Sequence, residues 1–164
     1  MSKIQLPGNE PSDVLRHFID EVSLVANNPR LSILIINSFL ELMVNILIEA
    51  KLKRGKEISE DNCSYSYSTK MTLLYELGFI WKDELFHNMN ILRDLRNRSA
   101  HHPFFKITEN DFRRFEPMSI QEDEWNQIIQ KLDITRIAGL IFVNLWNPYH
   151  EIYLEAFKKM QSNR

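Results

Sequence analysis

The sequence has little of what disulfide-rich, turn-rich or strongly basic proteins are made from. It contains one cysteine, Cys63, so neither an intrachain disulfide nor a cluster of thiolate metal ligands can form. Glycine and proline are scarce, at 4 and 6 residues, which disfavours a fold of many short strands and tight turns. The formal net charge is -2, which gives no global attraction for nucleic acid or anionic membranes.

Signals for export and for cofactor chemistry are also missing. The opening segment, MSKIQLPGNEPSD, lacks the apolar core of a signal peptide, so we expect a cytoplasmic protein. There is no glycine-rich phosphate loop and no serine or cysteine triad signature. His17, His87 and His150 lie singly, without metal-ligand spacing. We therefore expect neither a metal nor a cofactor.

The sequence is instead rich in apolar residues at helical spacing. Hydrophobic residues make up 44% and charged residues 26%, which is ordinary globular composition. The pattern predicts an all-α protein: one domain over residues 1–164, with a core from 12 to 160, folded as a bundle of about five to six helices. Helices are predicted over about 12–26, 30–53, 68–77, 82–100, 121–147 and 149–160, with one or two helical turns near 111–115.

Two connections in this pattern are predicted in detail. Residues 54–67, RGKEISEDNCSYSY, lose helical periodicity and gain polar residues, so we expect an exposed loop there. Ser68 is the expected N-cap of the helix that follows, and Gly78 is the expected left-handed residue that ends it.

The longest apolar run, Leu31 to Ile48, has the length of a membrane span. However, Asn37, Glu41 and Asn45 recur every four residues and place one polar seam along it. We therefore expect no membrane segment and interpret this run as the central core helix of the bundle.

The segment from Ile91 to Pro103, ILRDLRNRSAHHP, carries the most unusual side chains. Met89 and Leu92 recur at helical spacing, and the next position on the same stripe is Arg96, so its guanidinium is predicted to point inward. Pro103 disfavours helical geometry at the preceding residue, which places His101 at or near the end of the helix.

A buried arginine needs an anionic partner, and Glu41 on the polar seam is the obvious one. We predict a buried or half-buried ion pair between Glu41 and Arg96, because each is a lone charge on a stripe that otherwise consists of core residues. The alternative is that the seam faces solvent.

Arg96, Asn97 and His101 are the candidate catalytic residues. On a phosphodiester, His101 would act as general acid or base, Arg96 would neutralise phosphoryl charge and Asn97 would orient either group. Five residues correspond to about 500° of helical rotation, so Arg96 and His101 converge only if the last turn deforms or a second chain contributes. The alternative is a structural ion-pair arginine and a helix-capping histidine.

A local basic and aromatic stretch surrounds these three residues. Arg93, Arg98 and His102 are candidate binding residues, since cations beside aromatic rings can hold single-stranded RNA. Equally, the stretch can be a solvated helix end over a core pair of aromatic residues, Phe104 and Phe105.

Residues 68–103, STKMTLLYELGFIWKDELFHNMNILRDLRNRSAHHP, resemble the bacterial mannitol operon repressor family, MltR-like, and its relatives in the HEPN superfamily. The similarity lies in the LLYELGFI helix with its glycine stop, in the acidic start of the next helix, and in the Arg-x4-His ending of that helix. The apolar helix over 31–53 resembles the core helix that precedes them in that family.

The resemblance implies a helical bundle that is commonly dimeric. In ribonuclease members of the superfamily an Arg-polar-x3-His motif cleaves RNA without a metal, and this motif falls on Arg96, Asn97 and His101. MltR-like members are described as regulators of sugar-alcohol uptake. Fold alone decides neither role.

The interpretation that follows is a cytoplasmic regulatory or protein-interaction domain of the MltR-like type that works as a homodimer. Its further partner would be a protein or RNA. Glu41, Arg93, Arg98 and His102 are its candidate binding residues. Direct sequence-specific DNA binding is not expected, because no broad basic face is evident. The alternative is a metal-independent endoribonuclease that uses Arg96 and His101.

Overall fold

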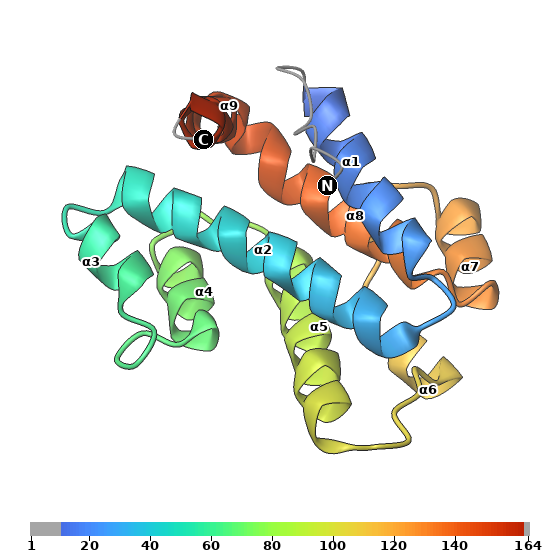
Figure 1. The fold of residues 1–164 in the computed structure, drawn as a ribbon. Coiled ribbons are helices and arrows are strands. Elements are labelled where there is room, and N and C mark those ends of the chain that lie inside the picture. The colour runs from blue at the N-terminus through green and yellow to red at the C-terminus, as the bar shows by residue number, and fades with distance from the viewer. Residues whose placement is uncertain (1–10, 163–164) are drawn as a thin grey trace.

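The prediction of an all-α protein is confirmed. The computed structural model describes residues 11–162, and every regular element within that range is helical (Figure 1). The elements are α1 (Pro11–Leu24), α2 (Pro29–Lys51), α3 (Gly55–Glu60), α4 (Tyr67–Glu76), α5 (Asp83–His101), α6 (Glu109–Phe112), α7 (Glu122–Gln130), α8 (Ile134–Trp146), the 3-10 turn η1 (Asn147–Tyr149) and α9 (His150–Ser162).

Helix α2 is the central element of the bundle. It begins where the Asn28 side chain accepts a hydrogen bond from the Leu31 amide, with Pro29 in its first turn. It contacts α1, α3, α4, α5, α8 and α9. By length and composition alone α2 could also cross a membrane, but in this fold 56% of its most apolar stretch is buried against neighbouring helices. The structure therefore uses α2 as a core helix.

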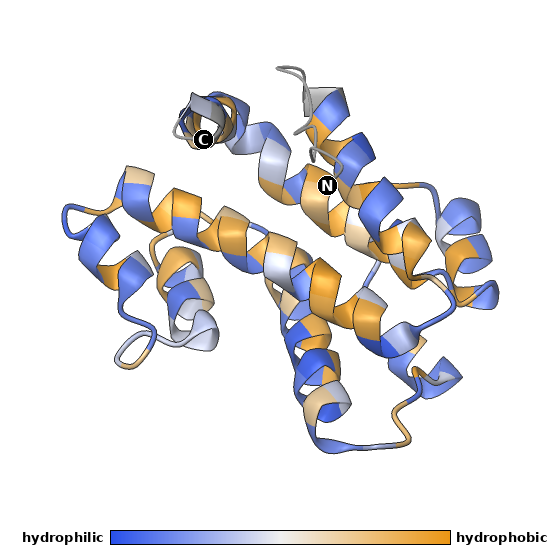
Figure 2. Ribbon diagram, viewed as in Figure 1, coloured by the Kyte–Doolittle hydropathy of each residue, from blue (hydrophilic) through white to orange (hydrophobic). Residues whose placement is uncertain are grey.

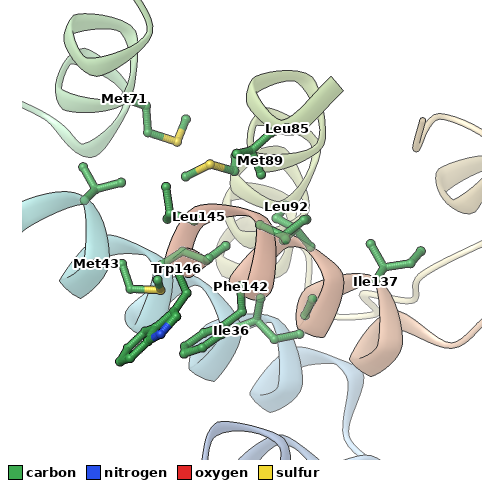
Figure 3. Packing of buried hydrophobic residues seen from close by; sticks show 14 of the residues in the cluster. Ile36, Met43, Met71, Leu85, Met89, Leu92, Ile137, Phe142, Leu145 and Trp146 are labelled. Carbon is green, nitrogen blue, oxygen red and sulfur yellow. The ribbon is translucent and has the colours of Figure 1, made fainter. Parts of the chain in front are cut away.

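The described helices share one hydrophobic core. Hydrophobic residues, orange in Figure 2, run along the ribbons of α2 and α8, and Figure 3 shows how their side chains meet those of α5. Ile36 and Met43 of α2, Met89 of α5 and Phe142 of α8 are each 1% exposed or less. Helix α9 closes one end, where Tyr153 stacks on Trp146 and the ring centroids are 5.1 Å apart.

The predicted loop over residues 54–67 is only partly a loop. It contains the short helix α3, whose first residue, Gly55, is buried against the end of α2. A Cβ on Gly55 would lie 2.1 Å from the carbonyl oxygen of Ile48, so the chain can turn this tightly only without a side chain. The predicted N-cap at Ser68 is also wrong. The N-cap is Ser66, whose side chain accepts from the Thr69 amide, and α4 begins at Tyr67.

The end of α4 agrees with the prediction. Gly78 has φ +74°, and its amide donates to the carbonyl of Tyr75 while the Phe79 amide donates to that of Leu74. These two bonds form a Schellman motif, which satisfies the last carbonyls of the helix and fixes the direction in which α5 starts.

The predicted single helix over 121–147 is wrong. The chain breaks at Leu132, which has φ +53°, and Asp133 then caps α8 by accepting from the Arg136 amide. Helices α7 and α8 are therefore separate. The helical turns predicted near 111–115 correspond to the short helix α6, which begins two residues earlier. The bundle has more and shorter helices than the apolar periodicity indicates.

Candidate functional site

Helix α5 carries the candidate residues, and its two halves have different surroundings. Leu85, Met89, Leu92 and Leu95 are buried. The buried face of α5 continues from Leu95 to Ser99, which is also fully buried, whereas Arg96 lies beside that face and is exposed to solvent. The prediction that Arg96 points into the core is therefore wrong, because the buried stripe passes through Leu95 and Ser99 and not through Arg96.

The predicted ion pair between Glu41 and Arg96 is absent from the described residues. Glu41 is half-buried and Arg96 is exposed. Both charges nevertheless act on the same phenol: burial raises the pKa of Tyr67 above its usual value, Glu41 raises it further, and Arg93 and Arg96 lower it. The charges thus surround Tyr67 at the junction of α2, α4 and α5 without pairing.

The polar seam of α2 serves partly to position α5. Asn37 is 2% exposed, and its Nδ2 donates to the carbonyls of Ile33 (2.9 Å) and Leu92 (3.1 Å). Two turns earlier, the Arg30 guanidinium donates to the carbonyls of His102 (2.5 Å) and Pro103 (3.1 Å). These bonds fix α2 and α5 side by side in antiparallel register.

Between those two anchors α2 leaves apolar side chains uncovered. Leu31 is 43% and Leu34 is 37% exposed, and Leu34 shares a helix face with Arg30. On α5 the neighbouring ridge carries Arg96 and, one turn later, Ala100, both exposed. We name this set of exposed residues the α2–α5 surface, since they lie on the parts of α2 and α5 that the bonds of Asn37 and Arg30 hold together; it comprises Leu31, Leu34, Ser38, Arg96 and Ala100.

His101 does not belong to that surface. It is the last residue of α5, as the sequence predicts, and it is exposed. Because five residues on a regular helix leave two side chains about 140° apart, Arg96 and His101 point in different directions. Neither forms a side-chain hydrogen bond or an ion pair with another described residue. One chain therefore does not bring Arg96, Asn97 and His101 to a common point.

Arg98 and Arg93 are engaged within the chain. The Arg98 guanidinium holds both carboxylate oxygens of Asp111, at 2.7 and 2.9 Å, and lies 5.8 Å from the centroid of the Phe105 ring. Arg93 donates to the hydroxyl of Ser68 near the start of α4. Both side chains connect α5 to its neighbours, which limits their freedom to bind a ligand.

Asp111 joins α5 to α6, and the sequence analysis did not predict this role. It is 3% exposed and also accepts from the amide and hydroxyl of Thr108, which makes a capping box at the start of α6. Burial alone raises the pKa of Asp111, but the hydrogen bonds from Arg98 and Thr108 lower it more, so the net pKa is below the ordinary value. The Thr-x-x-Asp spacing is the sequence signal that indicates such a box.

A pocket of about 410 Å³ lies at the end of α5. It is open to solvent and lined by Arg98, His102 and residues 103–106 and 108. Phe104 at its rim is 92% exposed, so the alternative of a core pair with Phe105 does not hold for it. Of the candidate residues, Arg98 and His102 line this pocket, whereas Arg96 and His101 do not.

No protein-family model, curated protein or solved structure matches this chain. Within residues 11–162 there is also no group of three or more His, Cys, Asp or Glu side chains placed to hold a metal ion.

Proposed function

We propose that this chain is a regulatory, protein-interaction domain of the MltR-like type, active in the cytoplasm as a homodimer. The observation that supports it is the α2–α5 surface: a helix with a buried core face presents Leu31 and Leu34 to solvent beside the exposed Arg96. Adjacent exposed apolar side chains on a charged surface are typical of protein contacts.

The charges on this surface favour a second copy as the partner. In a two-fold dimer the same surface of both copies forms the contact, so a residue of one copy contacts a different residue of the other. A surface with both signs of charge is therefore complementary to itself. Arg96 supplies the positive charge of this surface, and the half-buried Glu41, which borders it two turns after Leu34 on the same face of α2, supplies the negative one; the two form no ion pair within the chain. Across a two-fold axis, Arg96 of each copy can meet Glu41 of the other while Leu31 and Leu34 pack together.

Charge reversal tests this dimer. Sedimentation velocity at micromolar concentration should give twice the 19.5 kDa chain mass. Arg96→Glu and Glu41→Arg should each weaken dimerisation at least tenfold, through like-charge repulsion in the contact. The double variant should recover most of the affinity, and Leu34→Glu should give monomers.

The matched control is Arg16→Glu. Arg16 is an exposed arginine on α1, and the only ion pair it forms with described residues is with Asp13 three residues away, so its reversal should leave the dimer intact. A parent protein that sediments as a monomer contradicts the proposal, as does a double variant no better than the single ones.

The regulatory role rests on a protein partner. Pull-down from the native host with the parent chain should enrich one protein, and the same experiment with His101→Glu, which changes the exposed end of α5 outside the α2–α5 surface, tests whether that end takes part. Direct operator binding is not proposed, because the net charge is -2.

A metal-independent endoribonuclease is the second candidate. It is favoured by the exposure of Arg96 and His101, which form no bond with described side chains and are therefore free to meet a substrate. Incubation of the chain with a mixed-sequence RNA and its DNA counterpart, in EDTA, tests it. We expect no cleavage. Cutting of RNA alone that disappears in His101→Ala would favour the enzyme.

A further inference from the structure

The opposite end of α5 contains a second pocket that neither proposed function uses. Its volume is about 420 Å³, and it lies between the start of α5, residues 118–120 and the C-terminal part of α8. Since α5 has 19 residues, this end lies about 28 Å from His101. The pocket combines an apolar lining with four polar side chains, Lys82, Ser119, Asn144 and Asn147, of which the first three form one hydrogen-bonded cluster.

The ammonium group of Lys82 is the centre of the polar cluster. Its Nζ donates to the hydroxyl of Ser119 (2.6 Å) and to Oδ1 of Asn144 (2.9 Å), and it lies 4.8 Å from the centroid of the Trp81 ring. A lysine has three N–H donors, and only two of them are used by described residues. One donor is therefore left for a further acceptor.

The orientation of Asn144 is fixed by the backbone of α8. Its Nδ2 donates to the Leu140 carbonyl (2.9 Å), so its Oδ1 faces Lys82 and also accepts from the hydroxyl of Ser119 (3.3 Å). The cluster thus presents its polar groups in one arrangement before any ligand arrives.

Ser119 is held in a strained conformation that aims its hydroxyl at Lys82. Its φ is +47°, in the left-handed region that favours glycine. The preceding residue, Met118, is fully buried and fixes the chain at this point. Strain of this kind is most often retained where a side chain must be placed for a function.

The charge of Lys82 is not compensated. All its described partners are neutral, and no carboxylate of the described residues forms an ion pair with it. Lys82 is half-buried, so its charge remains available to a bound anion at this pocket.

We propose that this pocket binds a small organic monocarboxylate with an apolar body. The carboxylate would accept from the free N–H of Lys82 and from the Ser119 hydroxyl, which can rotate away from Asn144. The apolar body would lie against Met118, Leu140, Val143 and the exposed Trp81. A single cation with neutral helpers fits a singly charged carboxylate better than a phosphate, which is usually bound by several cationic donors.

Hexanoate is a suitable probe, and hexanamide is its neutral match of the same shape. In ¹H–¹⁵N NMR titrations of the full chain, hexanoate should shift the amides of residues 81–83, 118–120 and 143–147. Hexanamide should bind at least fivefold more weakly, because it lacks the charge that Lys82 binds.

Variants of Lys82 and Ser119 show whether these side chains bind hexanoate or only hold α5 against α8. Lys82→Met should weaken hexanoate binding at least tenfold. Ser119→Gly removes the hydroxyl and relieves the strained φ, so it should keep the fold and still weaken binding at least threefold. The matched control is Lys51→Met, since Lys51 also lies over aromatic rings, 5.1 Å from that of Tyr149, but lines no part of this pocket.

The proposal is overturned if hexanoate shifts other amides, if hexanamide binds equally well, or if Ser119→Gly binds hexanoate like the parent. If Lys82→Met does not fold, the hexanamide and Ser119→Gly measurements decide. A monomeric parent chain would contradict the dimer and leave this result standing, because the two sites lie at opposite ends of α5.

Discussion

The two sides of the C-terminal half of α5 differ sharply, although their arginines stand only two residues apart. Arg98 holds a buried carboxylate with both arms of its guanidinium, while Arg96 is exposed and has no partner among the described residues. The difference lies in the neighbours: α6 brings Asp111 to Arg98, whereas no element within residues 11–162 covers Arg96. Residues of the same type on one helix thus divide into a structural role and a surface that is available for binding.

Removal of Asp111 should have the largest effect on stability. Asp111→Ala leaves Arg98 unpaired and breaks the capping box of α6, so we expect a loss of about 2–4 kcal/mol in the free energy of unfolding. Urea denaturation of dilute protein measures it. Arg96→Ala is the matched control and should change the value by less than about 0.5 kcal/mol. Equal losses for the two variants would show that the two sides do not differ.

Acid should weaken the structural side selectively. The pKa of Asp111 is lowered in the folded state, so the stability that its carboxylate contributes is complete above the unfolded pKa of about 3.9 and is lost as the pH falls through the folded-state pKa. The parent chain should therefore be more stable than Asp111→Asn at neutral pH, and the gap should narrow as the pH falls below the unfolded pKa of about 3.9. A gap that stays constant over this range contradicts the assignment.

Glu41 should matter little to the fold of one chain. Because it forms no ion pair among the described residues, Glu41→Gln should cost less than about 1 kcal/mol in dilute, monomeric protein. A loss of about 3 kcal/mol or more would mean that a buried pair with Arg96 exists after all.

His101 should have the smallest effect. It is exposed, and the favourable interaction of a cation with the end of a helix amounts to a few tenths of a kcal/mol. His101→Ala should therefore unfold within about 0.5 kcal/mol of the parent. A larger loss, measured by the same urea titration, would give this residue a structural role that its surroundings do not indicate.

Local signals predicted the helices that they mark. The α2 and α5 boundaries agree to within one or two residues, because Asn28-Pro29 and the His102-Pro103 pair act on the backbone next to them. Gly78 was placed correctly for the same reason. The break at Leu132 was missed because Ile128 and Leu132 keep helical spacing, although Asp133 is a cap that the sequence displays.

The candidate site was harder to predict, since burial depends on distant segments. After Leu92 the apolar spacing allows either Leu95 or Arg96 as the next position of the stripe, and in the structure the buried face passes through Leu95 and Ser99. The partner of Arg98 comes from residue 111, across a loop whose path no periodicity describes. Asn37 was placed correctly on the polar seam of α2, but its burial and its hydrogen bond to the Leu92 carbonyl of α5 were not predicted.

The contact between Gly55 and the end of α2 gives a means of recognising distant relatives. With the Ile48 carbonyl oxygen 2.1 Å from where a Cβ would stand, any homologue that turns from its central helix in this way needs glycine at the equivalent position. A chain with a larger residue there must take another route, however similar its other helices. This one position can therefore sort candidate sequences by backbone path when overall identity is too low to do so.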